Sequence, residues 1–121
     1  MRTRPDIIRD LALPSGAVSV DEAGYLIDPE LWTREFAEAV AEQEGIEIND
    51  LHWRVIDYMR ASLDDHGIAP DARFVLKFLG EALGKTKEGS KQVLFELFPY
   101  GYVKQACKMA GMRQPRAWST G

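Results

Sequence analysis

Residues 49–84 read NDLHWRVIDYMRASLDDHGIAPDARFVLKFLGEALG. This stretch predicts two capped helices joined by a short turn. Asn49 or Asp50 offers a side-chain oxygen that caps the first helix, and Gly67 ends it. Asp71 opens the second helix, which ends at the last glycine of the stretch. Each helix carries a one-sided apolar stripe with the period of an α-helix: Val55, Ile56, Met59 and Leu63 in the first, and Phe74, Val75, Phe78, Leu79 and Ala82 in the second.

Helix signals continue on both sides of this pair. Upstream, Asp28-Pro29 starts a helix with inward residues at Trp32 and Phe36, and Gly45 stops it. Downstream, the pattern predicts a loop over 85–89, a short helix capped by Ser90, a break at Pro99-Tyr100-Gly101, and a fifth helix over about Tyr102–Ala110 that ends at Gly111.

The N-terminal residues have a different pattern. We expect a loosely held arm over 1–16 with one helical turn at Ile7–Leu11. Residues 18–27 read as a short hairpin whose turn contains Gly24. The chain is thus predicted to be mostly α (α+β): an orthogonal bundle of about five helices with a small N-terminal β-hairpin. One domain spans 17–111, and a flexible C-terminal arm follows over 112–121.

Length and composition narrow the class of protein. The 121 residues suit one domain, and 45% hydrophobic and 28% charged residues are typical of a folded one. No apolar run approaches the ~20 residues of a membrane span, and the N-terminus does not resemble a signal peptide. We therefore expect a cytoplasmic protein without membrane contact, and we expect it to be a monomer.

Cys107 is the only cysteine, so it is the one soft nucleophile of the chain. It lies on an apolar stripe with Val103, Ala106 and Ala110, which favours a small buried residue. Lys104 and Lys108, with Arg113 close by, favour a reactive thiolate instead. The helix C-terminus disfavours an anion, so both interpretations stay open. No metal-ligand spacing or cofactor motif is present, so we expect no metal and no cofactor.

Charge is divided unevenly along the chain. Residues 1–70 hold six Lys or Arg against fifteen Asp or Glu, whereas residues 71–121 hold nine against four, within a net charge of −4. The helix–turn–helix outline of 51–84 and the cations in and after its second helix allow a DNA-binding interpretation. Acidic residues in the first helix and turn weigh against it. The candidate contacts are Arg73, Lys77, Lys85 and Lys87.

Several ordered stretches resemble one known family. They are residues 20–26 (VDEAGYL), 32–41, 44–46 with His52-Trp53, 66–70 (HGIAP), 96–99 (ELFP) and 104–111 (KQACKMAG). Over about 17–116 the chain is similar to the TusE/DsrC family of sulfur-relay proteins, which includes the gamma subunit of dissimilatory sulfite reductase. The resemblance implies a helical bundle with an N-terminal hairpin and a mobile C-terminal arm. It also implies a cysteine near the end of that arm that carries sulfur into partner active sites.

The chain departs from the family at that cysteine. Cys107 matches the inner cysteine that many members have, but Trp118 stands eleven residues later and Thr120 is the second-last residue. The resemblance therefore implies a sulfur-relay accessory protein, more a carrier or accessory than a stand-alone enzyme. Its partner would be a siroheme sulfite reductase or a small sulfurtransferase complex, and Cys107 would be its only possible persulfide carrier. The alternative is a non-catalytic regulator that binds protein or DNA.

The tail that replaces the outer cysteine contains Arg113, Arg116 and Trp118. Tryptophan and arginine are enriched at binding hot spots, so these residues are candidates for a partner-binding arm. Alternatively, Trp118 folds back onto its own bundle and shields Cys107. Both interpretations stay open.

Overall fold

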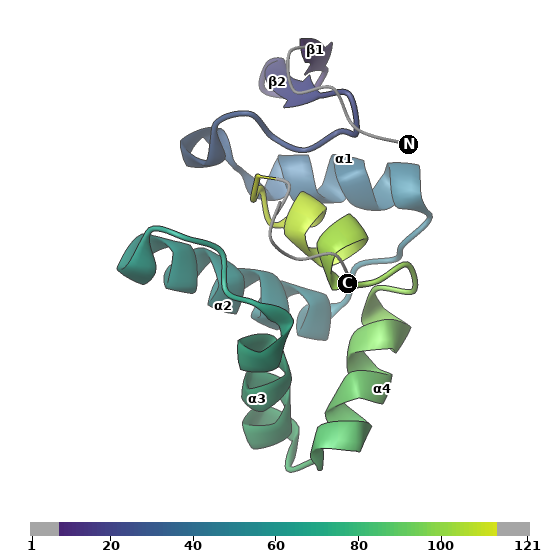
Figure 1. Ribbon diagram of the computed structural model, residues 1–121. Helices are drawn as coiled ribbons and strands as arrows, with labels where there is room; N and C mark the ends of the chain where they lie inside the picture. The colour runs from purple at the N-terminus through teal and green to yellow at the C-terminus, as the bar shows by residue number, and fades with distance from the viewer. Residues whose placement is uncertain (1–7, 114–121) are drawn as a thin grey trace.

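The computed structural model describes residues 8–113. Its elements run in the order β1 (Ile8–Leu11), β2 (Val18–Asp21), the 3₁₀-helix η1 (Pro29–Leu31), α1 (Arg34–Glu44), α2 (Asp50–His66), α3 (Ala72–Leu83), α4 (Lys87–Leu97) and the π-helix η2 (Tyr102–Cys107). The helices of the bundle cross at steep angles, and the two strands lie beyond α1 at one end (Figure 1). The predicted helical bundle with an N-terminal hairpin is confirmed.

The hairpin, however, pairs different residues from those predicted. β1 and β2 are antiparallel, with Ile8 opposite Asp21 and Leu11 opposite Val18. The predicted helical turn at Ile7–Leu11 is therefore wrong over its described residues. The predicted partner of β2, residues 25–27, contributes only an isolated bridge between Val20 and Leu26.

A tight turn explains why this second pairing stays short. The Asp21 carboxylate accepts hydrogen bonds from the backbone N–H groups of Ala23 and Tyr25, both at 2.9 Å. Gly24 has φ 94°, which favours glycine. The chain then turns inward, and Tyr25 and Leu26 enter the core instead of extending a ladder.

The helix expected from Asp28-Pro29 onward is split in two. Asp28 caps only η1, and the side chain of Thr33 caps α1 by accepting from the N–H of Phe36. Between them Trp32 is extended, with ψ 139°. The break places the Trp32 indole beside the end of the last helix, where its Nε1 donates to the carbonyl of Met109 at 2.8 Å.

The central pair of helices matches its prediction at every cap. Asn49 and His52 form a reciprocal capping box at the start of α2, and Gly67 ends it in the left-handed conformation. Asp71 caps α3, and Gly84 ends it with φ 65°. One inward assignment is wrong, because Phe74 is 53% exposed.

The fourth helix begins earlier than predicted. The cap of α4 is Thr86, whose side chain accepts from the N–H of Gly89. Most of the loop expected over 85–89 is thus the first turn of the helix. Ser90 is buried inside it, and its hydroxyl donates to the Thr86 carbonyl at 2.9 Å.

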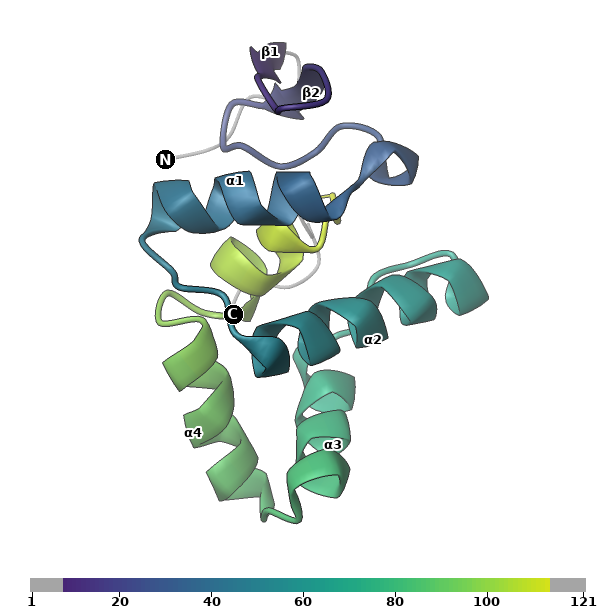
Figure 2. The same cartoon turned by 180° about the vertical axis from the view of Figure 1, so that it is seen from behind.

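The last helix lies against α1 on the side away from the strands, whereas α3 and α4 form a hairpin at the opposite end of the molecule (Figures 1 and 2). The helices and β2 share one hydrophobic core. Its largest fully buried side chains include Phe36, Ile56, Leu79, Phe98, Tyr102 and Met109. Within residues 8–113, no helix combines the length and the apolar composition that crossing a membrane requires.

Candidate functional site

Cys107 ends the π-helix η2, and its side chain is fully buried in the core. Burial raises the pKa of its thiol to about 12, because the charged thiolate would lose its hydration. A hydrogen bond with Tyr102 acts in the opposite direction but is the smaller effect. The Tyr102 hydroxyl donates its one hydrogen to the carbonyl of Pro70, so its oxygen is the acceptor toward the protonated Cys107 thiol. Of the two interpretations that the sequence left open, the structure therefore favours the buried residue, and the raised pKa keeps the thiol protonated at neutral pH.

The two neighbouring lysines do not share one environment. Lys104 is exposed. The Lys108 ammonium lies 3.7 Å from a carboxylate oxygen of Glu44 and 5.3 Å from the centroid of the Tyr25 ring. Through these contacts the Lys108 ammonium is paired with Glu44 of α1 and lies over the Tyr25 ring. Their predicted influence on the thiol stays a prediction.

The π-helix η2, which contains Cys107, is held by side-chain hydrogen bonds of Gln105 and Tyr25. Gly101, with φ 101°, leads into it, and the Gln105 amide oxygen accepts from the backbone N–H of Tyr100 at 2.9 Å. The other end of the same amide donates to Glu44 at 3.2 Å. The Tyr25 hydroxyl donates to the carbonyl of Val103 at 2.9 Å. Widened helical turns of this kind often occur at functional sites.

A clamp holds the end of this helix, and the sequence did not reveal it. Arg60 of α2 donates to the carbonyls of Ala110 at 3.1 Å and Pro29 at 2.8 Å. Its guanidinium also lies 4.9 Å from the centroid of the Trp32 ring. Gly111 follows with φ 73°, and a Cβ added there would lie 2.4 Å from Trp32 Cδ1. Trp32, Arg60 and Gly111 therefore fix the path of the chain as it leaves the bundle.

The predicted partner-binding arm begins just after this clamp. Met112 is still buried, so packed structure continues beyond Gly111. Arg113 is exposed. Arg116 and Trp118 lie outside the described residues.

The four candidate nucleic-acid contacts come together. Arg73 and Lys77 on α3, with Lys85 and Lys87 at the α3–α4 turn, line one groove between the two helices. Arg73 is held by Asp71 in an ion pair of 2.8 Å, and Glu81 also lines the groove.

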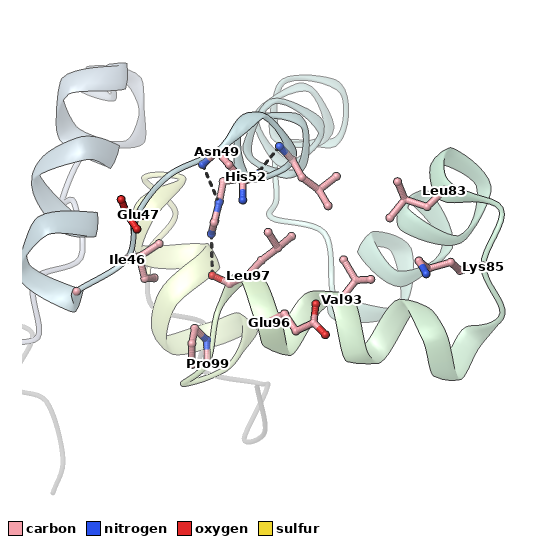
Figure 3. Close-up of a pocket in the computed structure, with 12 residues that line it drawn as sticks. Ile46, Glu47, Asn49, His52, Leu83, Lys85, Val93, Glu96, Leu97 and Pro99 are labelled. Atoms are coloured by element: carbon pink, nitrogen blue, oxygen red, sulfur yellow. Dashed lines mark hydrogen bonds between the residues drawn. The ribbon is translucent and has the colours of Figure 1, made fainter.

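A second groove, also missed at the sequence level, runs from the α1–α2 connection to α4 (Figure 3). His52 forms part of its wall and is almost fully buried. Its Nδ1 accepts from the backbone N–H of Asn49 at 3.1 Å, and its Nε2 lies 2.8 Å from the carbonyl of Leu97. Desolvation lowers the pKa of this imidazole, so it stays neutral and joins α2 to α4.

No candidate metal centre is found in the part of the chain that the structure describes: no three His, Cys, Asp or Glu side chains there lie together in a suitable group.

Comparison with known proteins places this geometry in context. The sequence matches the family described as DsrC like protein over residues 14–117. It is 39% identical over 98 residues to the sulfurtransferase TusE homolog of Haemophilus influenzae, covering 81% of this chain and 89% of the relative.

Two solved structures share the fold. The NMR structure of Allochromatium vinosum DsrC has a TM-score of 0.79 and 33% identity, covering 90% of this chain and 96% of that one. The oxidized gamma-subunit of the dissimilatory sulfite reductase from Archaeoglobus fulgidus has a TM-score of 0.77 and 32% identity, covering 88% and 96%.

Proposed function

Because this chain belongs to the DsrC-like protein family, we propose that it is a cytoplasmic, monomeric sulfur-relay accessory protein that docks to a siroheme sulfite reductase or a small sulfurtransferase complex. The family places it in sulfur relay. The names of its relatives support the two partner classes, since one is a sulfurtransferase homolog and another is a sulfite reductase subunit.

The burial of Cys107 carries the second part of the proposal, which concerns sulfur transfer. A carrier cysteine attacks as a thiolate: its sulfur bonds to the outer sulfur of a donor persulfide, the donor S–S bond breaks, and the donor thiolate leaves. A fully buried thiol with a pKa of about 12 does not meet these requirements in the resting fold. In its resting fold the protein therefore docks to its partner without carrying sulfur. Cys107 accepts sulfur only if that partner opens η2.

Intact mass measurement after incubation with a small-molecule persulfide donor tests this part. The native protein is expected to gain no sulfur, whereas the urea-unfolded protein gains one atom. The Cys107→Ser variant gains none in either state. Rapid addition of one sulfur atom per molecule to the native wild type would overturn the proposal that buried Cys107 does not accept sulfur. It would identify a carrier that needs no partner to open it. Repeating the native reaction with a sulfur-loaded sulfurtransferase separates partner-assisted carriage from a purely non-catalytic role.

Docking is tested separately by calorimetry with a purified sulfite reductase and a purified sulfurtransferase complex. We expect one of them to bind the wild type, and Trp118→Ala to weaken that binding if the arm is the contact. Ser119→Ala is the matched control in the same arm. Absence of binding to both partners would refute the docking proposal, whatever the sulfur-loading result.

The convergence of four cations in the α3–α4 groove supports a second candidate function, DNA binding. Phosphate contacts make affinity depend steeply on salt, and each one adds about 1 to the slope of log affinity against log salt. The double variant Lys85→Ala/Lys87→Ala is expected to lose about 2 from that slope. Lys91→Ala is the control, because Lys91 is outside the groove and pairs with Glu88 at 3.9 Å. A slope that the double variant leaves unchanged would reject this function.

A further inference from the structure

The groove between α3 and α4 is built on a close approach of the two helices at small residues. Gly80 of α3 has no side chain, and a Cβ added there would lie 3.2 Å from Ser90 Oγ and 3.2 Å from the carbonyl oxygen of Lys85. Ser90 is buried, and its hydroxyl donates to the Thr86 carbonyl at 2.9 Å. Both small residues line the groove, which has a volume of about 520 Å³. They leave room for a third segment to pack across the two helices.

The lining of this groove has an excess of positive charge. Lys77 of α3, Lys85 in the α3–α4 turn and Lys87 at the start of α4 line it, and all three are exposed. None of the three has an ion pair within residues 8–113. Among the described lining residues only Glu81 is acidic. The groove therefore attracts a segment that carries several carboxylates.

The same lining fits a protein segment better than it fits a DNA duplex. Most of its surface is apolar, and Leu76 and Gly80 contribute to that surface. A duplex is bound mainly through its phosphates, so an apolar lining adds little to its affinity. Glu81 would repel the phosphates, and the Arg73 guanidinium is already paired with Asp71 at 2.8 Å. An amphipathic helix instead places its apolar side chains in such a groove and its charged ones along the rim.

We propose that the groove between α3 and α4 receives an acidic amphipathic helix of the sulfur-relay partner. The apolar face of that helix lies against Leu76 and Gly80, and its carboxylates face the three lysines. This inference rests on the proposed docking function and names the surface that performs it. A third helix packs against a pair of helices by the same ridges and grooves that join the pair. The α3–α4 hairpin lies at the opposite end of the molecule from the last helix, so this contact is separate from the place where the chain leaves the bundle (Figures 1 and 2).

Calorimetry with the purified sulfurtransferase complex and the purified sulfite reductase tests the charges of the groove. The variant Lys85→Glu/Lys87→Glu is expected to bind the partner at least about 10-fold more weakly than the wild type, because two attractive contacts become repulsive. The matched control Arg54→Glu/Lys104→Glu has the same net charge, and both of its sites are exposed and outside the groove. It is expected to keep the wild-type affinity. Circular dichroism verifies that both variants are folded.

Cross-linking of the complex with a water-soluble carbodiimide identifies the chemistry of the partner segment, because this reagent joins a lysine amine directly to a carboxylate. We expect cross-links from Lys77, Lys85 or Lys87 to aspartate or glutamate residues of a single partner helix. Cross-links confined to lysines outside the groove, such as Lys104, would overturn the proposal. Binding of a random-sequence DNA duplex that Lys85→Glu/Lys87→Glu abolishes, with the partner affinity unchanged, would overturn it in favour of DNA.

The two levels of the proposal fail in different ways. Equal partner affinities of the wild type and Lys85→Glu/Lys87→Glu would overturn the assignment of the groove and leave the docking function in place. Absence of wild-type binding to both partners would overturn the docking function, and the groove assignment with it.

Discussion

Replacing Gly111 by alanine tests the clamp at the end of the last helix. Gly111 has φ 73°, a conformation that costs an ordinary residue about 1 kcal/mol. The added Cβ would also lie 2.4 Å from Trp32 Cδ1 and 2.9 Å from Trp32 Cβ. Trp32 cannot yield freely, because its indole donates to Met109 and Arg60 lies over its ring. Such overpacking costs about 1–3 kcal/mol, so the total destabilisation is about 2–4 kcal/mol.

Urea unfolding followed by circular dichroism measures this loss, and Gly84→Ala is the matched control. Gly84 has φ 65°, but an added Cβ meets nothing within 4 Å. Its variant is therefore expected to lose only the conformational cost of about 1 kcal/mol. Adding Trp32→Ala to Gly111→Ala should remove the 2.4 Å contact with Cδ1 and leave only the 2.9 Å contact with Cβ, so the combined loss should be smaller than the sum of the two single losses. Equal destabilisation by Gly111→Ala and Gly84→Ala would refute the clamp.

Three further predictions concern pH, the thiol and Arg60. Because the folded state lowers the pKa of His52 below its usual 6.5, the unfolded state binds its proton first. The free energy of unfolding should therefore fall as pH drops below about 6.5, and His52→Gln should flatten this dependence in urea titrations at several pH values. Native Cys107 should react with iodoacetamide at least about 100-fold more slowly than in urea, because reaction requires local opening; comparable rates would contradict its burial. Arg60→Met should lower the free energy of unfolding by about 2 kcal/mol through its lost hydrogen bonds, whereas the exposed Arg54→Met should change it little.

Local chemistry in the sequence determined most of the helix boundaries. The caps at Asn49 and Asp71 bond to groups within three residues, and Gly67 and Gly84 adopt their own left-handed conformations. Such features involve only near neighbours, so residue types in order are enough to predict them. The ordered family motifs likewise indicated the DsrC-like fold, whereas the apolar stripe and the neighbouring lysines left the burial of Cys107 open.

Contacts between residues far apart in the sequence decided the rest. Residues 25–27 have the stronger strand propensity, yet β2 pairs along its length with β1, because Tyr25 and Leu26 turn into the core. Trp32 interrupts the first helix because its indole meets a carbonyl 77 residues later. The protonated state of Cys107 and the groove beside His52 depend on several segments meeting in space. Periodicity reports which face of an element is apolar, but only packing determines what that face meets and how much water remains there.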